Sequence, residues 1–178
     1  FQGQYEGYGI TTSANGGTAK IDGLEVNYQQ QLTFLPGWLK GFGVYANVTK
    51  LQTEGDNSAF QTGPTSTAGG TLPGFLSTSG NLGISYRGHG FDIRPQAVYR
   101  GRYLTSNSTD PALVTYQEAK TTWSIKSRYA FTRRLSVFLD LENIFSEPVS
   151  KTYALHPDRV ILDYQFPTKI VGGITGRF

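Results

Sequence analysis

The stretch from Lys20 to Leu32, KIDGLEVNYQQQL, decides the fold. Its apolar side chains fall on one parity, at Leu24, Val26 and Tyr28, while glutamate, asparagine and glutamine fill the alternate positions. Alternation with a period of two is typical of a β-strand, because successive side chains point to opposite faces of the sheet. The stretch therefore predicts a strand with one apolar face and one wet face.

The same alternation recurs along the chain, with turn-forming residues between the segments. Strands are expected at residues 4–12, 20–32, 42–49, 76–87, 91–103, 119–131, 135–145 and 168–178. No segment of useful length has the helical period. We therefore predict an all-β fold, a single antiparallel meander of about eight strands in one domain. Pro95 lacks a backbone N–H, and it predicts a local bulge in its strand.

The expected connections alternate in length. Short turns are expected at residues 36–37, 88–90 and 132–134, and long loops at residues 53–75, 105–116 and 146–167. Outer-membrane β-barrels have this alternation of short periplasmic turns and long external loops. Aromatic residues gather beside the short turns, as in the interfacial girdles of such barrels: Phe34, Trp38, Phe42, Tyr86, Phe91, Tyr129, Phe131 and Phe178. The pattern predicts a transmembrane β-barrel segment in contact with outer-membrane lipid.

Charged side chains lie on the polar parity of the expected strands. Charges of both signs there suit a wet barrel lumen, since each would cost several kcal/mol against lipid. The residues expected to face the lumen are Glu25, Arg94, Arg100, Arg102, Lys126, Asp140 and Glu142. Counting the register from the turn at residues 132–134 sets Lys126 opposite Asp140, and we expect a cross-strand ion pair there. The alternative is that these charges form an ordinary solvated face.

The composition argues against several classes of function. The chain has no cysteine, so it has no disulfide, thiolate ligand or cysteine nucleophile. Its net charge of +3 comes from singly scattered residues and gives little support to nucleic-acid binding. The two histidines, His89 and His156, lie outside any nucleophile motif. The pair His156 and Asp158 lacks a third metal ligand. We expect neither catalysis nor a bound metal or cofactor.

Several stretches carry a family resemblance. Residues 15–26 read NGGTAKIDGLEV, residues 28–36 read YQQQLTFLP, and residues 72–74 read LPG. LENIF follows at residues 141–145, and GGITGRF at residues 172–178. In this order and spacing, the stretches resemble the C-terminal barrel of TonB-dependent outer-membrane receptors. The resemblance covers nearly the whole chain.

The resemblance implies a segment of a larger barrel, of about 22 strands in this family, with residues 1–178 as its C-terminal part. The family's plug domain is expected to be absent from this chain, which begins at Phe1 without a leader pattern and is interpreted as a fragment. A last strand that ends in Phe178 resembles the signal read by the barrel-assembly machinery. The expected location is the outer membrane of a Gram-negative bacterium.

The resemblance also implies active transport. Such receptors bind a scarce nutrient, such as a siderophore, cobalamin or an oligosaccharide, and import it with energy delivered through the TonB complex. Our candidates for ligand contact lie in the expected external loops: Tyr116, Tyr153, His156 and Asp158. The lumen arginines, Arg94, Arg100 and Arg102, are candidates for contact with acidic groups of the plug or with an anionic ligand.

Two other interpretations remain open on sequence alone. A soluble all-β module, such as a secreted carbohydrate-binding sandwich, has a similar content of glycine, threonine and aromatic residues. Eight strands can also close into a small barrel. The long side chains of the polar face would crowd so narrow an interior, which places this interpretation last.

Overall fold

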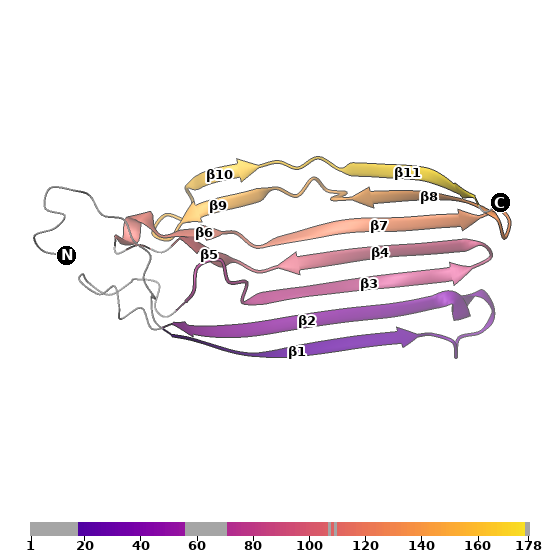
Figure 1. Ribbon diagram of the computed structural model, residues 1–178, viewed down its shortest axis with the longest axis horizontal. Coiled ribbons are helices and arrows are strands. Elements are labelled where there is room, and N and C mark those ends of the chain that lie inside the picture. The colour runs from indigo at the N-terminus through magenta and orange to yellow at the C-terminus, as the bar shows by residue number, and fades with distance from the viewer. Residues whose placement is uncertain (1–17, 56–70, 107, 109, 177–178) are drawn as a thin grey trace, which may run out of the picture.

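The computed structural model describes residues 18–55, 71–106, 108 and 110–176, which form two β-sheets (Figure 1). The main sheet consists of β1 (Ala19–Gln31), β2 (Phe42–Gly55), β3 (Thr78–Gly88), β4 (Phe91–Arg100), β7 (Lys120–Ala130), β8 (Leu135–Glu142) and β11 (Lys169–Gly176). The smaller sheet consists of β5 (Tyr103–Ser106), β6 (Thr115–Gln117), β9 (Val149–Tyr153) and β10 (Val160–Tyr164). Two short 3-10 helices are η1 (Gly37–Gly41) and η3 (Pro111–Leu113). Within these residues, no helix is long and apolar enough to cross a membrane.

The main sheet is an antiparallel meander in the order β1-β2-β3-β4-β7-β8-β11. Its seven strands are those expected from residue 20 onward. The turns near residues 88–90 and 132–134 are tight, whereas the connection around residues 36–37 runs from residue 32 to residue 41 and includes η1. The expected strand at residues 4–12 and the terminal Phe178 lie outside the described residues. The all-β class and the meander are confirmed.

Strand register places the alternating side chains on two separate faces. One row of paired residues on the apolar face runs from β1 to β7: Tyr28, Ala46, Leu82, Ala97 and Trp123. The adjacent row on the polar face crosses all the main strands: Gln29, Tyr45, Gly83, Gln96, Ser124, Glu142 and Lys169. Because paired antiparallel residues share a face, the alternation in the sequence becomes two chemically distinct surfaces.

The apolar face has no protein cover among the described residues. Leu24 of β1 and Ile170 of β11 each expose 67% of their surface. The fully buried apolar side chains are Leu104 and Val114, which belong to the region of the smaller sheet. A soluble sandwich would pack the apolar face against a second sheet, and a small closed barrel would pair β1 with β11. The described residues do neither and form an open, single-layered wall.

The expected long loops are wrong in part, because two of them contain strands of the smaller sheet. β9, β10 and most of β6 fall where loops were expected at residues 146–167 and 105–116. β2 also continues to Gly55, into the loop expected at residues 53–75. The missed strands are short and flanked by prolines at positions 111, 148, 157 and 167. Alternation over so few residues does not predict a strand.

The smaller sheet extends the main sheet at the end away from the short turns (Figure 1). Its order, β10-β9-β6-β5, follows the order β11-β8-β7-β4 of the main strands. The break between β8 and β9 contains Asn143 and Ser146, whose φ angles are both 53°. Asn143 Nδ2 donates to Phe166 O at 2.8 Å, and Thr168 Oγ1 donates to Asn143 O at 3.1 Å. These bonds satisfy carbonyl groups that leave the strand ladder at the break.

Pro95 does not produce the expected bulge. The register between β3 and β4 is the same on its two sides, with Gly83 opposite Gln96 and Tyr86 opposite Ile93. The register between β4 and β7 runs unbroken through Pro95. The proline removes one hydrogen-bond donor but needs no extra residue, so both neighbouring strands keep their alignment.

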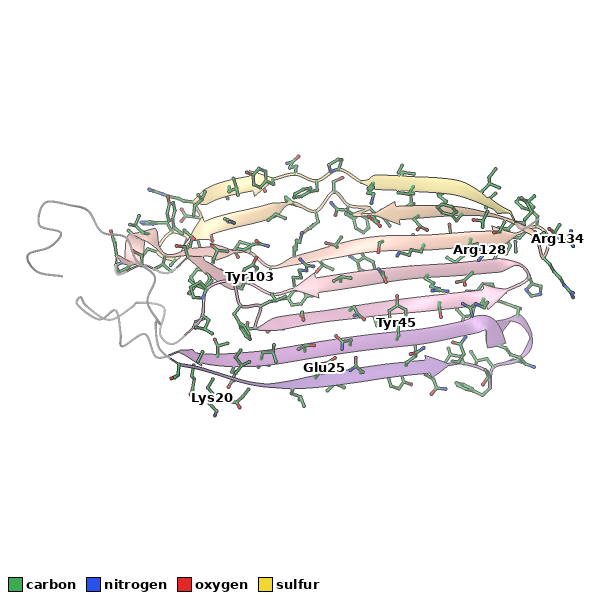
Figure 2. The ribbon with its side chains drawn as sticks, viewed as in Figure 1. Lys20, Glu25, Tyr45, Tyr103, Arg128 and Arg134 are labelled. Carbon is green, nitrogen blue, oxygen red and sulfur yellow. The ribbon has the colours of Figure 1, made fainter. Side chains whose placement is uncertain are left out.

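Tyr45 links three strands on the polar face. Its ring rises from β2 over Gly83 of β3 (Figure 2), and its hydroxyl donates to Gln96 Oε1 of β4 at 2.9 Å. A Cβ atom at position 83 would overlap the Tyr45 ring. The wall therefore requires glycine at this position.

We predict that Gly83→Ala lowers the free energy of unfolding by about 1–3 kcal/mol, because the added methyl group displaces Tyr45 and breaks its bond to Gln96. Gly172→Ala is the matched control, since a Cβ there would lie 3.5 Å from its nearest neighbour, Phe138 O, which is an ordinary contact. Urea unfolding of both variants in detergent measures the difference. Equal stability of the two variants would contradict the role assigned to Tyr45.

Candidate functional site

Asp92 is the centre of a charged cluster on the polar face. It is the second residue of β4, so the tight turn brings arginines from both strands to it. Arg87 Nη2 and Arg94 Nη2 donate to Asp92 Oδ2 at 2.9 and 2.8 Å. Arg128 of β7 is the register partner of Asp92, and its Nε donates to Ser136 Oγ at 3.0 Å. One carboxylate thus holds two guanidinium groups in fixed positions on the wall.

Lys126 and Asp140 lie opposite each other on β7 and β8, as the register count predicts. The expected ion pair is wrong, because neither side chain forms an ion pair with any described residue. An exposed pair gains too little in water to hold a long lysine side chain in one rotamer. Both residues line a cavity of about 210 Å³ with Arg94 and Arg128. A positive and a negative group are therefore available to a partner on this face.

The remaining lumen candidates are spread along the same wall. Glu25 Oε1 accepts hydrogen bonds from two asparagine side chains, each at 3.0 Å (Figure 2). Glu142 forms an ion pair with Lys169 Nζ at 3.2 Å. Arg100, the last residue of β4, lies opposite Lys120 of β7. The structure places these residues along the polar parity but does not gather them at one point.

A second group of residues lies where the main sheet meets the smaller sheet. Arg102 follows the end of β4, and its Nε donates to Glu118 Oε1 at 2.9 Å. Its guanidinium carbon lies 4.1 Å from the centroid of the Tyr116 ring, within the range of a cation–π contact. Thr152 Oγ1 donates to the same Glu118 oxygen. The structure therefore brings together an expected lumen residue, Arg102, and an expected ligand-contact residue, Tyr116.

Arg102 and Tyr116 line a cavity of about 420 Å³. The lining includes Leu51 and Thr53, which continue the polar parity of β2 beyond the charged cluster. Arg102 is already paired with a carboxylate. Among the described residues that line it, the cavity therefore has no free positive charge, and their electrostatics do not favour a small anion.

The other ligand-contact candidates are not gathered with Tyr116. Tyr116 pairs with Thr152, so the next residue, Tyr153, lies on the opposite face of the smaller sheet. His156 and Asp158 lie between β9 and β10. In the part of the chain that the structure describes, no three His, Asp or Glu side chains come together as a metal site.

Three residues that organise the polar face are missing from the sequence-based candidates. Asp92 has a readable signal, because a carboxylate beside a tight turn with Arg87 and Arg94 near it can pair with both. Tyr45 lacks such a signal, since its role depends on a glycine in the strand that separates it from Gln96, its bonding partner two strands away. Glu118 also lacks a signal in the sequence, because the smaller sheet, which the sequence does not predict, brings Arg102 and Thr152 to it.

We predict that Glu118→Gln destabilises the smaller sheet by about 1 kcal/mol, because Arg102 and Thr152 lose a shared carboxylate acceptor. Hydrogen exchange of the β6 and β9 amides measures the effect and should be faster in the variant. Glu142→Gln is the matched control, since it removes an exposed pair with Lys169 in the main sheet and should leave those amides unchanged. Unchanged exchange in Glu118→Gln would contradict the assignment.

Comparisons with known proteins agree with a wall-like architecture. The family model described as TonB dependent receptor-like, beta-barrel, matches residues 1–144. The crystal structure of the ferric citrate transporter FecA in the unliganded form has a similar fold, with a TM-score of 0.65 at 18% sequence identity over 89% of this chain. The chain covers 24% of that transporter chain, about a quarter of its length. No curated protein matches the sequence.

Proposed function

Because the chain belongs to the TonB-dependent receptor β-barrel family, we propose that it forms part of the wall of an outer-membrane receptor that imports a scarce nutrient with energy delivered through TonB. A barrel segment of such a receptor is not an enzyme, in agreement with the sequence. In this proposal residues 1–178 are the C-terminal part of the barrel, the plug belongs to the parent receptor, and Phe178 serves as the signal for barrel assembly. The nutrient is a siderophore, cobalamin or an oligosaccharide.

The separation of the two faces is the observation that carries the proposal. The apolar face extends across the main sheet and leaves Leu24, Leu139 and Ile170 exposed. The opposite face carries Asp92, Arg94, Lys126, Arg128 and Asp140, whereas the charged residues of the apolar parity lie at the end away from the short turns. Hydrocarbon stabilises the first face and penalises each charge on the second by several kcal/mol. A wall with lipid on one side and a wet, plug-filled lumen on the other satisfies both faces.

The polar face offers the plug a docking row. Arg94 is held in place by Asp92, whereas Lys126 and Asp140 have no partner among the described residues. Free charges of both signs beside a fixed guanidinium group suit a plug segment with complementary charges. Contact with the plug is therefore the role we assign to this row.

The cavity around Arg102 and Tyr116 is the proposed nutrient-facing part of this wall segment. Its lining includes residues from the end of β2, from β5 and from β6. These elements lie at the end away from the short turns, where the smaller sheet extends the wall (Figure 1). Outer-membrane barrels place this end outside the cell. Tyr153, His156 and Asp158 remain contact candidates at the same end, although Tyr153 lies on the other face from Tyr116.

Uptake by the full receptor that contains this chain tests the proposal. The receptor is expressed in a Gram-negative host stripped of its own nutrient receptors, and uptake of labelled ferric citrate, cobalamin and a short oligosaccharide is measured. We expect the receptor in the outer-membrane fraction, and uptake of one probe that falls to background when TonB is deleted. A soluble receptor, or uptake that does not depend on TonB, would contradict the proposal.

A further inference from the structure

A groove opens on the apolar face at the short-turn end of the main sheet. It has a volume of about 390 Å³ and is lined by uncharged residues of η1, β2, β3 and β4: Trp38, Phe42, Ile84, Tyr86, Ile93 and Pro95. The cavities of the polar face have charged linings. The groove is thus an apolar site of its own, within the size range of ligand pockets.

Strand register explains the floor of the groove. Phe42, Tyr86 and Ile93 form one paired row across β2, β3 and β4. Ile84 lies two residues from Tyr86, and Pro95 lies two residues from Ile93, in both cases on the same parity and farther from the short turn. Pro95 contributes its ring to the floor, which adds apolar surface. Pro95, which removes one donor from the strand ladder, thus forms part of the lining of this groove.

Trp38 forms the wall of the groove at the short-turn end. It exposes 60% of its surface, and its ring centroid lies 5.7 Å from that of Phe42 and 6.3 Å from that of Tyr86, edge to face. Tyr86 is fixed in turn, because Gly88 leaves room for its ring and its hydroxyl lies 3.1 Å from His89 Nδ1. The wall is therefore a preformed aromatic cluster.

Lys40 places a positive charge in η1, the same short helix that supplies Trp38 to the groove. It lies two residues from both Trp38 and Phe42, so its Cα is within about 8 Å of the Cα of each. Its side chain is exposed and forms no ion pair with any described residue. A lysine stem can cover apolar surface while its ammonium group stays in the headgroup layer.

We infer that this groove binds one acyl chain of an anionic phospholipid whose headgroup phosphate is held by Lys40. The inference rests on the proposed function, which sets the apolar face in the membrane and the short turns on the periplasmic side. The groove matches the acyl chain, and the free ammonium group matches the charge of the headgroup. A second copy of the chain does not suit the site, because a stable protein interface buries about 1,000 Å² or more, far beyond these six side chains.

Native mass spectrometry of the full receptor, released from micelles that contain equal amounts of phosphatidylglycerol and phosphatidylethanolamine, tests the inference. The wild type should retain one phospholipid, with phosphatidylglycerol preferred. Lys40→Gln should lower retention of phosphatidylglycerol about fivefold, since a lysine near the membrane surface contributes about 1 kcal/mol. Ile84→Trp should fill the groove and lower the retention of both lipids.

Lys50→Gln and Trp123→Ala are the matched controls, because both residues lie on the apolar parity further from the short turns. They should retain lipid as the wild type does. The inference would be overturned if the wild type retained no lipid or formed a dimer in place of binding lipid. It would also be overturned if Lys40→Gln and Ile84→Trp retained as much lipid as the wild type. A wild-type receptor that fails to enter the outer membrane would overturn the proposed function instead.

Discussion

Hydrocarbon offers a backbone N–H or C=O group no partner, so a membrane-spanning sheet must satisfy each group from the strand beside it. The main sheet meets this constraint strand by strand, from β1 to β11. Even Pro95 lies within an unbroken register between β4 and β7. Within the described residues, β1 and β11 are the edge strands of the main sheet, and in lipid these edges require further strands. The open wall is therefore understood as part of a larger closed barrel.

Backbone pairing also separates the chemistry of the two faces. Register carries each odd–even alternation across the neighbouring strands, so over most of the main sheet apolar side chains lie on one side and charged ones on the other. Lys20, Asp22, Lys50 and Glu54 share the apolar parity, but at the end away from the short turns. The cluster around Asp92 and the unpaired Lys126 and Asp140 belong to the polar side. The groove beside Trp38 belongs to the apolar side. In the proposed receptor each face has its own partner, the plug on one side and lipid on the other.

The sequence predicts the main strands and their faces well, because alternation over eight or more residues is a strong local signal. The register of Lys126 with Asp140 follows from one tight turn, but the ion pair does not, since side-chain contacts depend on rotamers and water. The short strands β6 and β9 pair with each other across a long stretch of sequence, which no local pattern reveals. For the same reason, the contact between Arg102 and Tyr116 emerges only from the structure.

The account depends most on the assignment of alternate side chains to lipid and to lumen. The chain has no native cysteine, so a fluorophore can be attached to single cysteines introduced along β8, from Leu135 to Glu142, in the full receptor. Brominated lipid should quench labels at the odd positions strongly and labels at the even positions weakly. Quenching without this alternation, or odd positions shielded from lipid, would contradict the account.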